Sequence, residues 1–132
     1  MSPLDVALNL HRALEAGVHG EALAAHWTDD VVTAEYPNMI SPRGRTSDRS
    51  AMVAASTLGA GLLSSQRYDL VEAFEHGDTA VLRLTWTGVV AADTGPFTAG
   101  QELTAHIAQV IRTRNGKVAA LATYDCYEPF AS

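Results

Sequence analysis

Apolar positions follow a helical period early in the chain and a strand-like pattern in its second half. After Ser2, which can cap a helix N-terminus, apolar residues recur at helical spacing as far as Gly17. A second, shorter helix is expected over residues 21–27, and a third from a cap at Ser47 to Leu58. The chain therefore begins with a largely helical region.

Strand signals dominate the rest of the chain. A short strand is expected over residues 31–36, ended by Pro37 and preceded by a break at residues 28–30. Four strand segments follow the third helix, separated by turns that contain glycine: 66–75, 79–91, 99–114 and 117–127. Asn115 and Gly116 join the last two, and both tolerate the positive φ of a type I′ hairpin turn. Consecutive strands of this kind favour an antiparallel meander.

The order of these elements indicates the fold class. Two helices, a strand, a third helix and four long strands are typical of an α+β domain whose helices cover one face of a curved antiparallel sheet. The 132 residues contain no internal repeat, low-complexity tract or linker. We therefore expect a single domain over residues 1–132.

The net charge and the distribution of apolar residues argue against nucleic acids and membranes as binding partners. The formal net charge is −6, and the nine Lys and Arg residues form no stripe, which argues against a nucleic-acid or anionic-membrane surface. No apolar run approaches the ~18 residues of a membrane-spanning helix. Residues 1–5 lack the basic and apolar segments of a signal peptide, so we expect a cytoplasmic protein.

Residues typical of cofactor chemistry are sparse. Cys126 is the single cysteine, which excludes an internal disulfide, and we expect it to be a packed strand thiol. The five histidines show no metal-ligand spacing, and there is no nucleophile elbow or phosphate-binding loop. We therefore expect no metal and no cofactor.

An ionisable residue lies on each arm of the last hairpin, within otherwise apolar runs. His106 and Asp125 could form an acid–base pair if the hairpin register brings both to one face of the sheet. The carboxylate would then fix the imidazole tautomer, or burial would make Asp125 itself the proton carrier. The alternatives are a core or rim histidine and an aspartate that caps a turn.

Several short motifs stand out along the chain: His26 to Val32, Glu35 to Asn38, Gly44, Trp86 to Gly88, Gly116 to Val118 and Tyr124 to Phe130. Together with the order of the elements, they resemble the SnoaL-like and ketosteroid-isomerase-like branch of the nuclear-transport-factor-2-like (NTF2-like) superfamily. The resemblance implies an NTF2-like cone, in which three N-terminal helices and a curved half-barrel sheet enclose an apolar pocket. It also implies a homodimer packed through the outer face of the sheet.

The ketosteroid isomerase pattern places its catalytic groups at positions that differ here. Its base immediately precedes a proline, and Tyr36 before Pro37 occupies that place. Its first-helix tyrosine falls near Leu10 and its oxyanion-hole acid near Ala108. Steroid isomerisation is therefore not expected.

The SnoaL-like cyclase pattern matches better. It uses an acidic residue on the last strand and a histidine on the strand before, and Asp125 and His106 are the residues of those types on those strands. Thr123 competes with Asp125 for the place of the cyclase aspartate.

Five further residues are candidates for the pocket. The phenol of Tyr36 could donate a hydrogen bond to a substrate oxygen, or its ring could fill the cone. Asn38 could orient a polar substrate group, although Pro37-Asn38 is equally typical of a turn. Met52, Tyr68 and Trp86 could give the pocket adaptable and aromatic walls, or belong to the core.

Three functions are consistent with this sequence. The first is a cofactor-independent isomerase or cyclase that uses proton transfer on an apolar small molecule, such as a polyketide- or terpenoid-like metabolite. The second is an epoxide hydrolase in the same pocket, which requires more interior carboxylates. The third is a non-catalytic domain for small-molecule binding or dimerisation.

Overall fold

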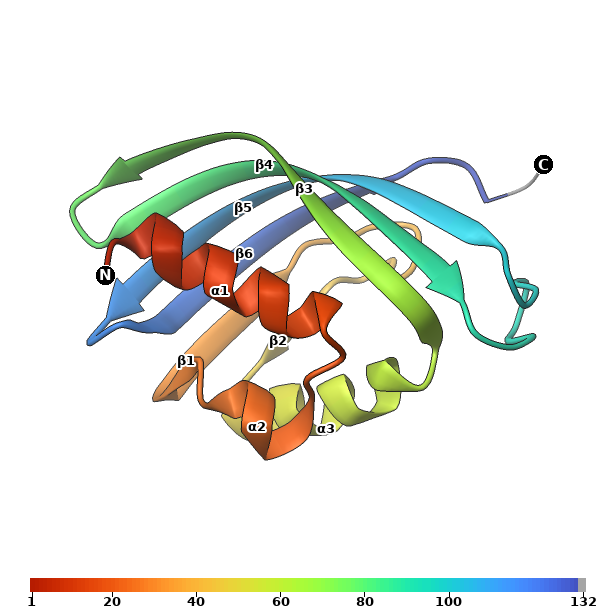
Figure 1. Ribbon diagram of the computed structural model, residues 1–132, viewed down its shortest axis with the longest axis horizontal. Coiled ribbons are helices and arrows are strands. Elements are labelled where there is room, and N and C mark those ends of the chain that lie inside the picture. The colour runs from red at the N-terminus through yellow and green to blue at the C-terminus, as the bar shows by residue number, and fades with distance from the viewer. Residues whose placement is uncertain (131–132) are drawn as a thin grey trace.

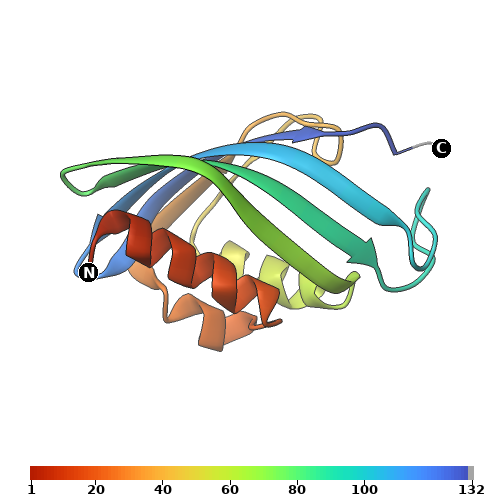
Figure 2. The ribbon, with the colours of Figure 1, turned by 45° about the horizontal axis from the view of Figure 1, so that its top comes forward.

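Helices lie on one side of a single curved sheet in the computed structural model, which describes residues 1–130 (Figure 1). The helices are α1 (Pro3–Glu15), α2 (Gly20–Ala24) and α3 (Arg49–Ala60). The strands are β1 (Trp27–Glu35), β2 (Arg45–Ser47), β3 (Leu63–His76), β4 (Thr79–Val90), β5 (Glu102–Arg114) and β6 (Lys117–Tyr127). Figure 2 shows that the sheet curves over the helices and leaves its convex face uncovered by them.

The sheet is mixed, although an antiparallel one was expected. Its strand order is β2-β1-β6-β5-β4-β3, and β3 to β6 form the predicted antiparallel meander. Strand β1 instead pairs in parallel with β6, and the short strand β2 covers the other edge of β1. The connection from β1 runs through α3 and the whole meander, which supplies the long crossover that a parallel pair requires.

The turn between β5 and β6 sets the register of the hairpin. Asn115 and Gly116 have φ of 54° and 74°, the left-handed conformations that a type I′ turn needs. Arg114 therefore lies opposite Lys117, and the pairing continues along both strands with one irregularity near the turn. This register decides which side chains of β6 face the helices.

The boundaries of several predicted elements were wrong, and the second helix, expected over residues 21–27, ends at Ala24, so that Trp27 begins β1. Residues 28–30 do not break the chain but lie within β1, at an irregularity in its pairing with β6, and the exposed carboxylates of Asp29 and Asp30 remain solvated. Ser47 belongs to β2, and the cap of α3 is Asp48, whose carboxylate accepts a hydrogen bond from the Ala51 amide.

The hydrophobic core fills the space between α1, α2 and the concave face of the sheet. Strand alternation gives β4 and β5 one buried row each, which includes Leu82, Leu84 and Ile111. In β5 the odd-numbered residues from 103 to 111 are buried, and the even-numbered ones lie on the convex face. Any functional group on these strands is thus assigned to one face by its position.

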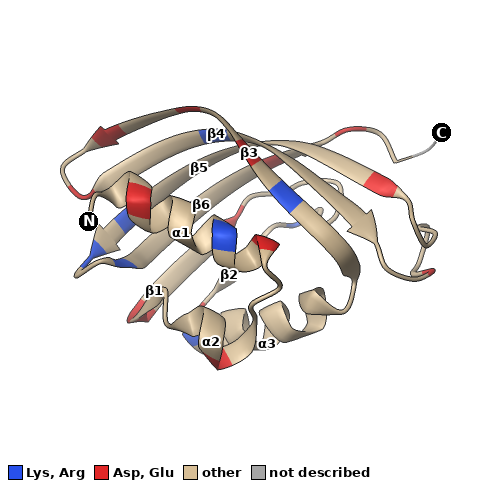
Figure 3. Cartoon of the chain, in the orientation of Figure 1, with Lys and Arg blue, Asp and Glu red and all other residues tan. Residues whose placement is uncertain are grey.

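Charged side chains do not gather on one surface. Arg112, Arg114 and Lys117 lie near the turn of the β5–β6 hairpin, and the other Lys and Arg residues are spread over the molecule among acidic residues (Figure 3). Within residues 1–130, no helix has the length and apolar character needed to cross a membrane.

Candidate functional site

The hairpin register places His106 and Asp125 on opposite faces of the sheet. His106 lies opposite Cys126, whereas Asp125 lies opposite Ile107, which belongs to the buried row of β5. Neighbouring residues of a strand point to opposite faces, so Asp125 faces the helices and His106 faces outward. The predicted acid–base pair is therefore not formed, because the register places Cys126, the residue after Asp125, opposite His106.

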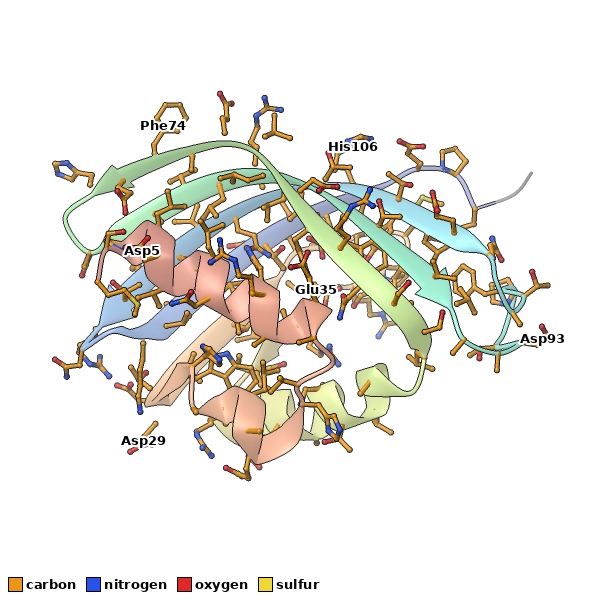
Figure 4. All side chains as sticks on the ribbon, viewed as in Figure 1. Asp5, Asp29, Glu35, Phe74, Asp93 and His106 are labelled. Carbon is orange, nitrogen blue, oxygen red and sulfur yellow. The ribbon has the colours of Figure 1, made fainter. Side chains whose placement is uncertain are left out.

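His106 makes its own contact on the convex face. Its Nε2 lies 2.8 Å from Oε2 of Glu128, and the imidazole is 60% exposed. Figure 4 shows His106 projecting from the side of the sheet away from the helices. Cys126 is exposed on the same face, contrary to the expectation of a packed thiol, because it follows the alternation of His106. Neither group can reach a molecule held in the concave interior.

Tyr36 also points away from the interior. Its ring stacks on that of Tyr124, with centroids 4.5 Å apart, and both rings are partly exposed on the convex side. The interior group at this end of β1 is Glu35, which lies beside Thr123 of β6 (Figure 4). Glu35 was not among the expected site residues, because in the family pattern the base immediately precedes the proline, and that residue is Tyr36 here.

Asp125 ends a chain of hydrogen bonds that begins on α1. The hydroxyl of Thr123 donates to Oδ1 of Asp125 at 2.6 Å and accepts from Nε2 of Gln109 at 3.3 Å. Oε1 of Gln109 lies 2.9 Å from Nε2 of His11, which is buried. The ring of His11 stacks on that of Tyr68 at 4.6 Å. Tyr68 therefore supports this chain from β3.

Burial of the Asp125 carboxyl raises its pKa above the usual range. The hydrogen bond from Thr123 acts in the opposite direction, and the nearby negative charge of Glu35 reinforces the increase. Burial and the charge of Asp125 likewise raise the pKa of Tyr68 and of Tyr127, so both phenols keep their protons at neutral pH. The interior thus holds a carboxyl that keeps its proton to a higher pH than an exposed aspartate does, near the hydroxyl groups of Thr123, Tyr68 and Tyr127.

Glu35 is held from two sides. Asn38 donates from Nδ2 to Oε2 of Glu35 at 2.9 Å, and the guanidinium of Arg45 lies 3.6 Å from Oε1. Gly44 has φ of 67°, and a Cβ there would lie 2.6 Å from the carbonyl oxygen of Glu35, so only glycine fits this close approach. The loop between β1 and β2 therefore positions this carboxylate.

Asn38 is engaged entirely within that loop. Besides its bond to Glu35, it donates to the carbonyl oxygen of Tyr36, and its Oδ1 accepts from the amides of Ile40 and Ser41. This is the turn interpretation of Pro37-Asn38.

An apolar cavity of about 240 Å³ opens at the end of the cone near the β4–β5 loop. Its lining consists of Ile40, Gly59, Leu62, Leu63, Trp86, Val90, Thr94, Phe97, Leu103 and Tyr127. Trp86 and Tyr127 meet edge to face with centroids 6.1 Å apart, and the Trp86 indole donates to Gln66 Oε1 at 2.9 Å. Gly88 leaves the room that the Trp86 ring occupies. The cavity thus has a rigid aromatic wall.

A second cavity of about 190 Å³ lies under α3, and Met52 and Glu35 both line it. The hydroxyl of Thr33 donates to the sulfur of Met52 at 3.1 Å. Asp125 lies close to a residue of each cavity. Its negative charge raises the pKa of Tyr127, which lines the first cavity, and the negative charge of Glu35, which lines the second, raises the pKa of Asp125. Within residues 1–130, no cluster of three or more His, Cys, Asp or Glu residues is arranged to hold a metal ion.

His11 was the least expected member of this interior. It lies within the apolar stripe of α1, and a histidine in such a stripe is a signal that the sequence did contain. Gln109 and Tyr127 could not be identified in the same way, because their facing depends on the strand register.

Burial of His11 predicts a loss of stability in acid. Its pKa is lowered by desolvation, so below pH 6.5 the unfolded chain binds a proton that the folded protein does not. The free energy of unfolding should therefore fall with pH below 6.5, by at most about 1.4 kcal/mol per pH unit from this group. Urea unfolding at pH 7.5 and pH 5.5 measures the decrease. In His11→Gln the decrease should be smaller, and an equal decrease in both proteins would contradict the assignment.

Many solved structures have the same architecture as this chain. Three of them share only 17–18% sequence identity with it. IdmH from Streptomyces antibioticus, a proposed polyketide cyclase, shares 18% identity with a TM-score of 0.77 over 95% of this chain and 92% of its own. AclR from Streptomyces galilaeus, a proposed hydroxylase, shares 18% identity with a TM-score of 0.71 over 93% and 87%. At such identities the similarity establishes the fold and no activity.

The third structure is of a protein described by its fold. A protein from Catenulispora acidiphila with a ketosteroid isomerase-like fold shares 17% identity with a TM-score of 0.70 over 94% of this chain and 86% of its own. The NTF2-like cone is therefore confirmed. No curated protein shows significant sequence similarity to the chain. The family model of the SnoaL-like domain matches residues 7–121, and the chain belongs to the SnoaL-like domain family.

Proposed function

We propose that this protein is a cofactor-independent isomerase or cyclase that moves a proton on a neutral, apolar small molecule, with Asp125 as the acid–base group. The observation that carries the proposal is the placement of Asp125, which faces the concave interior beside an aromatic cavity and has a raised pKa. A carboxyl in such surroundings can both accept and return a proton near neutral pH.

The hydrogen bonds of Asp125 indicate how the step would proceed. Oδ1 accepts from Thr123, and among the described residues Oδ2 has no hydrogen-bond partner. Oδ2 would take a proton from a carbon next to a substrate carbonyl, so that the C–H bond breaks and an O–H bond forms. The electron pair moves to the carbonyl oxygen, and the proton then returns to a different carbon or to that oxygen.

Tyr127 would stabilise the oxygen charge that develops. It lines the cavity and lies close enough to Asp125 for its pKa to rise, so its phenol remains a hydrogen-bond donor. From the sequence this role was expected of Tyr36, whose ring stacks on Tyr124 on the other face.

The composition of the cavity supports an apolar substrate without a negative charge. Its lining contains no charged residue, and the negative charge closest to hand is that of Asp125, which acts on Tyr127 of the lining. An anionic group would be repelled here and would lose its hydration without compensation. A polyketide- or terpenoid-like ketone fits this lining, and the description of IdmH as a proposed cyclase agrees with it.

Exchange with solvent tests the proposal, and it does not require that the product be identified. The protein is incubated in D₂O with neutral cyclic monoketones and terpenoid enones, and mass spectrometry follows deuterium incorporation at carbon. Catalysed incorporation above the buffer rate is expected for ketones that fit the cavity. Saturable binding of the same ketones with no exchange would instead establish a non-catalytic binding protein.

Epoxide hydrolysis is a second candidate, favoured by one observation. Glu35, Arg45 and Asp125 bring two carboxyl groups and a guanidinium to one side of the sheet, whereas from the sequence Asp125 was expected to be the interior strand carboxyl, apart from Glu72 and Glu102, whose facing was open. Such a set could activate water and protonate an epoxide oxygen. Incorporation of ¹⁸O from labelled water into a diol product would identify hydrolysis, and isomerisation would leave the product unlabelled.

We further propose that a second copy of the chain covers the convex face of the sheet. One outward row across the central strands is apolar, and it consists of Ala34, Ala122, Val110 and Val81.

An arginine in the middle of this face should prevent dimerisation. We expect Ala122→Arg to sediment as a monomer and the wild type as a dimer, because the charge would be buried without a partner. Leu58→Arg changes an exposed residue of α3 and should leave the dimer intact. A wild type that is monomeric at all concentrations would refute the dimer.

A further inference from the structure

The interior hydrogen-bond chain has a direction, and its two possible directions are not equivalent. It runs from His11 on α1 through Gln109 on β5 to Thr123 and Asp125 on β6. The amide of Gln109 has a donor end and an acceptor end, and a hydroxyl has one proton to give. Each link therefore dictates the orientation of the next.

In one direction every donor points toward Asp125. His11 donates from Nε2 to Gln109, Gln109 donates from Nε2 to Thr123, and Thr123 donates to Oδ1 of Asp125. In the other direction a protonated Oδ1 donates to Thr123, Thr123 donates to a reversed Gln109 amide, and that amide donates to an unprotonated Nε2 of His11. The neutral imidazole would then carry its proton on Nδ1.

The surroundings of His11 decide between the two. Nδ1 is buried and no described residue hydrogen-bonds it. In the first direction this atom is an unpaired acceptor, whereas in the second it is an unpaired N–H group. Buried N–H groups without a partner are rarer in proteins than unpaired acceptors. The first direction is thus the stable one.

We propose that His11 is a positioning residue that holds the chain in this direction, so that Oδ1 of Asp125 always accepts and the mobile proton of Asp125 is confined to Oδ2. The catalytic use of that proton rests on the proposed function. The direction of the hydrogen-bond chain does not depend on a substrate. It gives a histidine in the apolar stripe of α1 a role in the acid–base site.

The other groups around the chain leave this arrangement unchanged. Asp125 is flanked by Tyr68 of β3, Tyr127 of β6 and Glu35 of β1, which are acidic or neutral and do not donate a hydrogen bond to Oδ1. His11 is near the carboxylate of Glu15, which accepts a bond from the amide of Tyr68. Among the described residues, Thr123 is the donor to Oδ1, and Gln109 is the side chain that orients it.

The ¹⁵N resonances of the His11 ring test the direction in the unmodified protein. At pH 7.5 we expect Nε2 to carry the proton and Nδ1 to be unprotonated. A proton on Nδ1 with a bare Nε2 would reverse the chain and overturn the proposal. This measurement needs no substrate and no variant, so it remains decisive if substitutions at His11 impair folding.

Variants of His11 test the effect on Asp125 through its carboxyl ¹³C resonance. His11→Phe keeps an aromatic ring on Tyr68 but removes the donor, and should raise the pKa of Asp125 by about half a unit to one unit as Thr123 loses its orientation. His11→Gln keeps an N–H donor and should lie nearer the wild type. Val6→Ala, a buried change on the same helix, should leave this pKa unchanged. A His11→Phe protein with an unaltered Asp125 pKa would show a merely structural role.

These results are separable from the proposed function. If the ring ¹⁵N pattern and the pKa changes are as expected while no ketone exchanges, the chain direction stands and the enzyme proposal fails. If exchange occurs but His11→Phe titrates like the wild type, Asp125 works without this positioning.

Discussion

Asp125→Asn is expected to lower catalysed deuterium exchange by about 10²- to 10⁴-fold, the usual contribution of a general acid–base group. The amide has nearly the shape of the carboxyl and can still accept a hydrogen bond from Thr123 through its oxygen. It cannot accept a proton from carbon, so turnover should be lost while ligand binding in the aromatic cavity remains within a few fold. Exchange rates and calorimetric affinities for the same ketone measure the two effects separately.

A matched substitution on the other face provides the control. His106→Ala removes an imidazole that is 60% exposed and bonded to Glu128 on the convex face, and should retain most of the exchange activity. If His106→Ala abolished exchange and Asp125→Asn did not, the assignment of the concave face as the site would be wrong.

Leu82→Ala is expected to destabilise the fold by about 3–4 kcal/mol, as truncations of fully buried leucines typically do. Leu82 has 0% exposure and lies opposite Gln109, one of the residues of the interior chain. Truncation would remove apolar area from the core and leave a cavity that the strands cannot close. The free energy of unfolding, from urea titrations followed by circular dichroism, gives the loss.

The same truncation on the surface should have little effect. Leu58→Ala removes the same atoms from a residue that is 76% exposed on α3, and should change the free energy of unfolding by less than about 0.5 kcal/mol. Similar losses in the two variants would mean that the buried row of β4 is assigned to the wrong face.

Local patterns were sufficient to predict most of the elements. The apolar stripe after Ser2 predicted α1, and Asn115-Gly116 predicted the β5–β6 hairpin, because each depends on residues close together in sequence. The parallel pairing of β1 with β6 was not predictable in this way. It joins segments from opposite ends of the chain and has no turn to mark it.

The site was harder to predict because it depends on facing and on distant contacts. One residue along a strand changes the face, which is why His106 and Tyr36 were selected together with Asp125 although they face outward, and why the inward Glu35 was missed. The contact between His11 and Gln109 joins residues 98 positions apart, and no local pattern indicates it. Asp125 was identifiable as a carboxyl inside an apolar strand. This signal does not depend on which residue is its partner, so it remained valid although the pairing with His106 was wrong.

The carboxyl ¹³C titration of Asp125 in the wild-type protein tests the central claim most directly. We expect a pKa clearly above 3.8, because the folded protein buries this carboxyl beside the negative charge of Glu35. A further increase should follow when an apolar ketone fills the cavity and excludes water. A pKa at or below 3.8, unaffected by ligand, would show that Asp125 is an ordinary ionised carboxylate and would contradict its role as the proton carrier.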